Sequence, residues 1–160
     1  MNMHGGKHMK IRKLSIDDYE EIYDLWLSTP GMGLNDIDDS KIGIEKYLKR
    51  NPNTCFVAET SGKIIGVILS GHDGRRGYIY HTAVSIHNRN KGIGSALVDS
   101  VLKALQEEGI SKVALVVFER NEAGNAFWVN KGFYAREDLV YRNKTLTEIH
   151  RIDMWIIIFQ

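Results

Sequence analysis

The sequence of 160 residues contains a single cysteine, Cys55, and two prolines, and its 21 lysines and arginines almost balance its 20 aspartates and glutamates. One cysteine excludes an intramolecular disulfide and a zinc site built from several thiolates, and it suits a reducing compartment. A net charge of +1 argues against a protein that binds nucleic acid by neutralising phosphates. The sequence also lacks a run of about 18 apolar residues and the apolar stretch of a signal peptide, so we expect a cytoplasmic protein that binds no membrane.

Strand and helix patterns predict one domain at residues 10–145 with an extension at each end. The elements follow in the order β-α-α-β-β-β-α-β-α-β-β, and no repeat or low-complexity tract indicates a second domain. Residues 1–9 are expected to be a disordered N-terminal extension. Residues 146–160 finish in the apolar run 154–159, which we expect to form an added strand or an interface such as that of a homodimer.

Four helices can be placed from the spacing of apolar residues. One follows Ser15 and stops at Pro30, a second ends before Pro52, a long one starts near Ile93 and ends at Gly109, and a short one covers 122–131. Strands are expected at 10–14, 55–59, 63–70 and 78–85, with one or two more within 133–143. The apolar run 112–118 predicts a central strand, covered on both faces and paired in parallel through a right-handed crossover.

The most informative stretch lies between the strand at 78–85 and the long helix, and it reads Arg89-Asn90-Lys91-Gly92-Ile93-Gly94-Ser95-Ala96-Leu97. Glycines at a helix start leave the backbone N–H groups accessible, and these groups, with Arg89 and Lys91 beside them, favour a phosphate. A Rossmann fingerprint needs glycine in place of Leu97, and no Walker A sequence is present. Taken alone, the pattern also fits an ordinary helix start with flexible glycines.

Together with Asn121, Trp128 and Gly132-Phe133, this layout resembles the GNAT family of acetyl-CoA-dependent N-acetyltransferases over residues 10–144. The resemblance implies an α/β fold of the mixed α+β type, with a mostly antiparallel sheet of six to seven strands and helices on both faces. It implies acetyl-CoA as cosubstrate, no metal, and an amine-bearing small molecule or protein as acceptor. Two strands would splay apart to admit the coenzyme, and the residues implied to bind it are Ala83, Val84, Ile86, Arg89, Asn90, Lys91, Gly92, Ile93, Gly94, Ser95, Ala96, Asn121 and Trp128.

The reaction that the resemblance implies is direct attack of a neutral amine on the thioester, with a backbone N–H near Val84 stabilising the oxyanion. The family commonly has a tyrosine seven positions after Asn121 that protonates the leaving thiolate. Here that position is Trp128, and an indole N–H cannot supply this proton. Tyr134 and Tyr141 are candidates to replace it, and so is water.

Candidates for the proton acceptor are Tyr80, His81 and Glu119. Tyr80 and the nearby Tyr78 have an ordinary pKa near 10, which makes them poor bases at neutral pH. His81 has the better intrinsic pKa, but strand alternation places it on the face opposite Tyr78, Tyr80 and Val84 unless a bulge shifts the register. A core histidine is the alternative for His81, and a solvated strand end is the alternative for Glu119.

Two loops carry charged residues that would contact the acceptor. The loop 30–39 is expected to line the acceptor site, and its Asp36, Asp38 and Asp39 would attract a cationic amine. The alternative is that these aspartates cap the next helix. The turn 73–77 carries two arginines that would bind an acidic group of the acceptor or form only an exposed turn.

Two other classes of function stay open. One is an acyl-CoA-binding module with little or no transferase activity, suggested by Trp128, and the other is an assembly component joined through the apolar end of the chain. Cys55 is expected to be a buried structural thiol rather than a nucleophile, because nothing near it in the sequence would lower its pKa.

Overall fold

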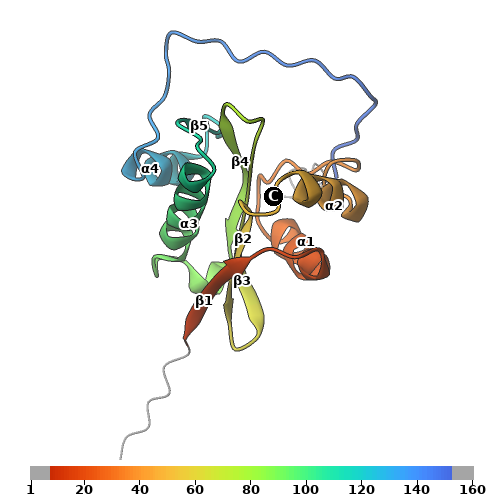
Figure 1. Ribbon diagram of the computed structural model, residues 1–160, viewed down its shortest axis with the longest axis vertical. Helices are drawn as coiled ribbons and strands as arrows, with labels where there is room; N and C mark the ends of the chain where they lie inside the picture. Colours follow the sequence, from red (N-terminus) through yellow and green to blue (C-terminus); the bar gives the residue numbers. More distant parts are fainter. Residues whose placement is uncertain (1–7, 153–160) are drawn as a thin grey trace, which may run out of the picture.

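The computed structural model describes residues 8–152, in which five strands form one sheet in the order β1-β2-β3-β4-β5. The first four pair antiparallel and the last pairs in parallel: β1 (Met9–Lys13), β2 (Phe56–Thr60), β3 (Lys63–His72), β4 (Gly77–Val84) and β5 (Val113–Ala114). Helices α1 (Tyr19–Leu27) and α2 (Lys41–Arg50) cover one face, and α3 (Ile93–Glu107) and α4 (Glu122–Asn130) cover the other (Figure 1). The expected mixed fold with helices on both faces is confirmed.

Each face of the sheet has its own apolar core. On one face α1 buries Ile22 and Trp26 against the sheet, and Ile44 of α2 joins them. On the other face α3 buries an apolar stripe that includes Leu97 and Val101. The spacing of these side chains at three, four and seven positions is what allows one side of each helix to be removed from water.

The sheet has fewer strands than the six to seven expected. The run 112–118 is not a central strand, because only Val113 and Ala114 pair with β4, and Val116 and Phe118 beyond them are 60% and 40% exposed. The strands expected within 133–143 are absent from the described chain. A strand needs a neighbouring edge for its hydrogen bonds, and two residues of β5 offer almost none.

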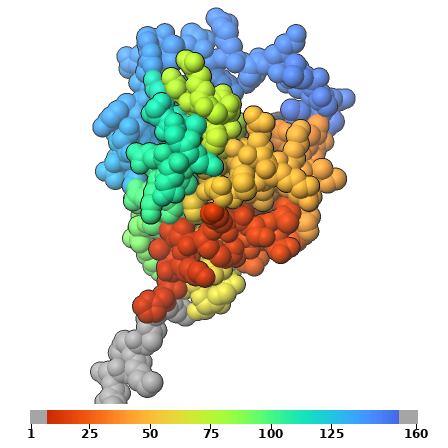
Figure 2. Space-filling model, in the orientation of Figure 1, coloured from red at the N-terminus to blue at the C-terminus, as the bar shows by residue number. Residues whose placement is uncertain are grey.

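The two ends of the domain differ slightly from the expected boundaries. β1 begins at Met9, inside the expected extension 1–9, and residues 1–7 and 153–160, which include the apolar run, lie outside the described residues. The segment after α4 lies at the surface, at the end of the molecule that also carries the β3–β4 turn (Figures 1 and 2). It returns to the loop before α2, where an isolated antiparallel bridge joins Arg151 to Asn35.

Two short 3-10 helices, η1 (Ile16–Asp18) and η2 (Ile86–Asn88), connect the larger elements. η1 starts with Ser15, which forms a capping box with Asp18 and leads directly into α1. η2 lies between the end of β4 and the glycine-containing turn that starts α3. The fold therefore brings the end of β4 and the start of α3 together within nine residues.

Candidate active site

β4 and β5 separate after two residues. Their pairing is limited to Gly77 with Val113 and Tyr78 with Ala114. Within the described chain, no strand pairs with this edge of β4 from Ile79 to Val84. Unpaired backbone N–H and C=O groups on a strand edge can accept an extended ligand as if it were another strand.

The start of α3 has no side-chain cap. The N-cap residue is Gly92, with a φ of +77°, whereas Ser40 and Asn121 cap α2 and α4 through their side chains. The first backbone bond of α3 runs from the N–H of Ala96 to the carbonyl of Gly92, so the N–H groups of the first turn before it have no acceptor within the helix. A Cβ placed on Gly92 would meet nothing within 4 Å, so the turn opens to solvent.

Gly94 has closer surroundings than Gly92. A Cβ on Gly94 would approach Phe127 at 3.4 Å and Val84 at 3.7 Å. These are ordinary van der Waals distances, so Gly94 lies against α4 and the end of β4, whereas Gly92 faces open space. A role of Gly94 in binding a phosphate stays a prediction.

The other residues expected to bind the coenzyme surround this turn or pack behind it. Arg89, which is exposed, donates from Nε to the carbonyl of Val84 at 3.3 Å. Ser95 accepts a hydrogen bond from Lys131 at 2.8 Å, which ties α4 to α3. Exposed positions in the turn are Ile86, Asn90 and Lys91, while Ile93 and Ala83 are buried in the core and Ala96 is partly buried.

Asn121 and Trp128 have structural contacts on α4. The side chain of Asn121 accepts from the N–H of Gly124 at 2.9 Å. Trp128 packs edge-to-face against Phe127 and Phe133, with ring centroids 5.0 and 5.1 Å apart. These contacts explain both side chains without a ligand, and contact of either residue with coenzyme stays a prediction.

A bulge in β4 changes the face on which His81 lies. Val67 pairs with Ala83 and Leu69 pairs with Tyr80, so the single residue between Val67 and Leu69 faces two residues of β4. His81, one of those two, has a φ of +37°, a value that few residues other than glycine adopt. This bulge shifts the alternation that regular β geometry would impose.

Because of the bulge, His81 shares the α1 face with Tyr80, contrary to the regular alternation. Its ring lies edge-on to Trp26 of α1 at 5.2 Å and to Tyr80 at 6.3 Å. Val84, expected on the same face as Tyr80, packs in the core on the α3 side instead. The bulge that the sequence analysis left open is therefore present, and it puts His81 on the face of Tyr80 and Val84 on the other.

His81 forms a buried pair with Asp39 from the loop between α1 and α2. Nε2 of His81 lies 2.7 Å from Oδ1 of Asp39, and the side chains are only 16% and 4% exposed. The other carboxylate oxygen, Oδ2, accepts from the N–H of Asn35 at 2.8 Å. The hydroxyl of Tyr19 donates to the carbonyl of Asp39 at 2.7 Å, which fixes the loop against α1.

Two tyrosines lie beside this pair on β4. The rings of Tyr78 and Tyr80 are 4.6 Å apart, and Tyr80 also contacts Tyr47 of α2. Burial, with Tyr141 and Tyr80 adding to it, raises the pKa of Tyr78 to about 12, and burial and Tyr141 also raise the pKa of Tyr80. A raised pKa keeps both phenols protonated, so neither is a base at neutral pH.

The remaining catalytic candidates are outside this cluster or at its rim. Tyr141 is 67% exposed and contributes to the raised pKa of both Tyr78 and Tyr80, so it lies near the rim of the cluster. Tyr134 is 77% exposed after α4, and Glu119 is exposed in the loop before α4. The contact of Asp39 with His81 was not predicted from the sequence, because 42 positions separate the two residues.

The three aspartates of the loop have different partners. Asp36 accepts from the backbone N–H of His150 at 2.8 Å and lies 3.0 Å from its Nδ1. Asp38 accepts from Nδ2 of Asn35 at 3.1 Å and contributes to the raised pKa of Tyr80. None of them caps α2, because Ser40 does so, and the capping alternative is therefore wrong.

Cys55 is 1% exposed, and its thiol contacts the carbonyl of Ser70 at 3.2 Å. Burial raises its pKa to about 12, which keeps the sulfur as an unreactive thiol. The expectation of a buried structural cysteine is confirmed.

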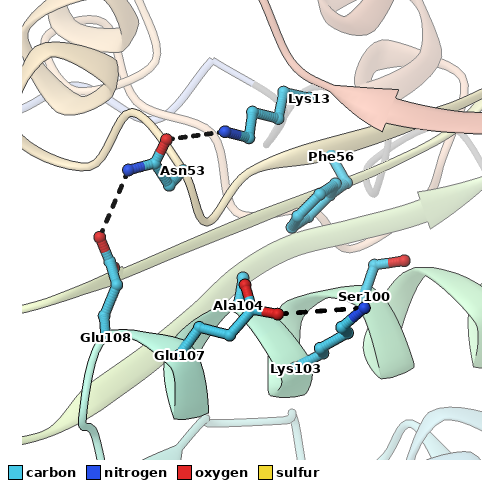
Figure 3. A pocket seen from close by; sticks show the side chains of 8 residues that line it. All are labelled: Lys13, Asn53, Phe56, Ser100, Lys103, Ala104, Glu107 and Glu108. Carbon is cyan, nitrogen blue, oxygen red and sulfur yellow. Dashed lines mark hydrogen bonds and ion pairs between the residues drawn. The ribbon is translucent and has the colours of Figure 1, made fainter.

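A hollow of about 540 Å³ lies on the α3 side of the sheet, between the start of β2 and the last turns of α3 (Figure 3). Polar pairs join its walls: Lys13 donates to Asn53 at 2.8 Å, and Asn53 reaches Glu108 at 3.5 Å. Within residues 8–152, no three histidine, cysteine or acidic side chains gather as a metal site requires. No helix of that part of the chain is long and apolar enough to cross a bilayer.

Comparison with known proteins agrees with this geometry. A family model described as the acetyltransferase (GNAT) family matches residues 19–133. The chain is 37% identical over 119 residues to an acetyltransferase of Photorhabdus laumondii, covering 72% of this chain and 79% of that protein. Ard1 from Thermoplasma volcanium has the same fold, with a TM-score of 0.71 at 24% identity over 79% of this chain and 82% of Ard1. Rv2747 from Mycobacterium tuberculosis, solved in complex with CoA and NLQ, gives a TM-score of 0.66 at 23% identity over 80% and 73% of the two chains.

Proposed function

The chain belongs to the GNAT acetyltransferase family, and we propose that it transfers an acetyl group from acetyl-CoA to a primary amine of its acceptor. The observation that best supports acetyl-CoA as the donor is the uncapped start of α3 at Gly92, which follows the open edge of β4. Backbone N–H groups at a helix start bind phosphate, and an open strand edge pairs with amides such as those of pantetheine. The CoA in the solved complex of Rv2747 supports the same donor.

The amine attacks the thioester carbon directly in this proposal. The only cysteine is buried and protonated, so it cannot carry the acetyl group as an enzyme thioester. As the nitrogen–carbon bond forms and the carbon–sulfur bond breaks, backbone N–H groups near Val84 stabilise the oxyanion. The coenzyme leaves as a thiolate that takes up one proton.

Three side chains at the site are candidates for the proton transfers. His81 is the candidate that combines a suitable intrinsic pKa with a place beside the open edge of β4, so we assign it the proton from the acceptor ammonium. Tyr80, whose raised pKa keeps its hydroxyl protonated, is placed to donate to the thiolate or to hold a water that does so, and Tyr141 lies near it. Tyr134 and Glu119 are less suited, because both are exposed outside the tyrosine cluster.

The test is calorimetric titration of the protein with CoA, followed by thiol detection with acetyl-CoA and a panel of primary amines. The panel would contain peptide N-termini, lysine, polyamines and aminoglycosides. Saturable CoA binding and amine-dependent thiol release are expected. CoA binding without thiol release for any amine would favour an acyl-CoA-binding module, and no CoA binding would refute the proposal.

A further inference from the structure

We propose that Asp39 is a positioning residue that sets the tautomer of His81, so that Nδ1 is the atom that accepts the proton of the acceptor ammonium. This inference rests on the proposed acetyl transfer and adds to it a residue from the loop between α1 and α2. Asp39 touches neither the donor nor the acceptor in this role. It acts through the 2.7 Å contact with Nε2 of His81.

The chemistry of the pair determines which ring nitrogen is free. A carboxylate has lone pairs and no proton to donate, so Nε2 of His81 must carry the hydrogen in this contact. In a neutral imidazole the other nitrogen, Nδ1, then has the lone pair. Within residues 8–152, Nδ1 takes part in no hydrogen bond, so its lone pair is free for the acceptor.

Asp39 itself is held on several sides. Its second oxygen accepts from the N–H of Asn35, and its carbonyl accepts from the hydroxyl of Tyr19. A carboxylate that is 4% exposed and fixed in this way keeps the imidazole in one orientation. The strained φ of His81 and the bulge in β4 bring the ring to this carboxylate, and a regular strand would direct it to the other face.

The proton balance of the step is complete. Nδ1 takes one proton from the ammonium, and the neutral nitrogen then attacks the thioester carbon. The second proton leaves the nitrogen as the carbon–sulfur bond breaks and goes to the thiolate, directly or through water. The imidazolium, stabilised by Asp39, releases its proton to solvent before the next cycle.

Ionisable side chains that contact the ring come from two elements, Asp39 from the loop and Tyr80 from β4 itself, while α1 contributes the neutral Trp26. Removing the negative charge of Asp39 makes the imidazolium less stable. The acidic limb of the pH profile of kcat/KM should therefore move to lower pH in Asp39→Asn, while the rate on the plateau falls because the tautomer is no longer fixed.

A second histidine–carboxylate pair provides a matched control. Nε2 of His72 lies 2.8 Å from Oε2 of Glu108, at the end of α3 and away from the open edge of β4. Glu108→Gln removes the same kind of charge from the same ring nitrogen without touching the site. It should leave both kcat/KM and its pH profile as in the wild type.

The experiment measures kcat/KM against pH for the wild type, Asp39→Asn, Glu108→Gln, His81→Gln and the double variant His81→Gln/Asp39→Asn, with an amine that the wild type accepts. We expect Asp39→Asn to lose about 100-fold, and the double variant to be no slower than His81→Gln, because Asp39 acts only through His81. CoA titration and thermal melting of each variant identify loss of folding. Additive losses, or an unchanged profile in folded Asp39→Asn, would overturn the inference while leaving the acetyl transfer intact.

A readout that needs no acceptor complements the kinetics. Nitrogen-15 NMR of the wild-type histidines should show His81 with hydrogen on Nε2, and this signature should be lost in Asp39→Asn. Hydrogen on Nδ1 in the wild type would overturn the inference even if the enzyme is active. A wild-type protein that releases no thiol with any amine would overturn the proposed function, and the catalytic role of Asp39 with it.

Discussion

The guanidinium of Arg12 and the carboxylate of Asp18 form a two-point ion pair, with Nη1–Oδ2 and Nη2–Oδ1 distances of 2.8 Å each. Asp18 also accepts from the N–H of Ser15 at 2.9 Å, so it closes η1 and joins β1 to the start of α1. Burial acts to raise the pKa of Asp18, but Arg12 and Ser15 outweigh it and hold the pKa below its ordinary value of 3.8. The pair therefore stabilises the helix that carries Trp26 to the site.

Asp18→Asn should lower the free energy of unfolding by about 2 kcal/mol at pH 7, the usual cost of losing hydrogen bonds to a charged group. Because the pKa of Asp18 is depressed in the folded protein, its contribution is fully present above the ordinary pKa of 3.8. It is lost as the pH falls through the lower folded value. Urea unfolding at a series of pH values should show the two proteins converging in acid.

The control for this prediction is Asp138→Asn. Asp138 makes a comparable two-point contact with Arg136, but the side chains are 66% and 54% exposed. Solvent screening makes such pairs worth little, so the loss should be much smaller than that in Asp18→Asn. Equal losses in the two variants would show that burial does not strengthen the Arg12–Asp18 pair.

Gly92→Val should weaken CoA binding by on the order of 100-fold, since a side chain on this open turn would block approach to the bare N–H groups of α3. The φ of +77° adds a backbone cost to the substitution. Gly109→Val provides the control, because Gly109 has a φ of +78° at the other end of α3 and equally open surroundings. Both variants should be destabilised to a similar extent. Calorimetry that finds equal CoA affinity in both would argue against a phosphate site at Gly92.

Cys55→Ala should retain the wild-type kcat, because a buried thiol with a raised pKa is poorly suited to carry an acetyl group. Removing the sulfur leaves a small cavity beside Ser70, so the free energy of unfolding should fall by about 1 to 2 kcal/mol. In the folded wild type the thiol should resist iodoacetamide at pH 8, since its pKa is about 12. Loss of turnover in a folded Cys55→Ala protein would instead indicate an acetylated enzyme.

The sequence predicts those features that are encoded within a few residues. The helix that ends at Gly109 and the turn that starts it at Gly92 both follow from local spacing and glycine conformation, and the structure has them. The prediction of a strand over 112–118 was wrong because the length of a strand here depends on pairing with β4, and local composition does not specify that pairing. A strongly apolar run was interpreted as a central strand, although only two of its residues pair.

The site was harder to predict for a related reason. The bulge that places His81 beside Trp26 arises from how β4 pairs with β3, and the residue types at the bulge do not predict it. The contact of His81 with Asp39 joins positions 42 residues apart, which strand alternation alone could not bring together. Catalytic assignments therefore depended on long-range pairing, whereas the glycine turn at the start of α3 depended on local sequence.

Asp38→Asn should raise the KM for a cationic acceptor about threefold to fivefold, which corresponds to the energy of one exposed charge pair. Asp38 is exposed in the loop 30–39 and acts on Tyr80, so its charge lies beside the tyrosine cluster where an ammonium would enter. The affinity for CoA should not change, and the effect should shrink in 0.5 M salt because screening weakens exposed charges. Asp24→Asn, which removes an exposed carboxylate from α1, tests whether net charge alone has this effect. An equal rise in KM for both variants, or an unchanged KM in Asp38→Asn, would exclude local recruitment of the amine by this loop.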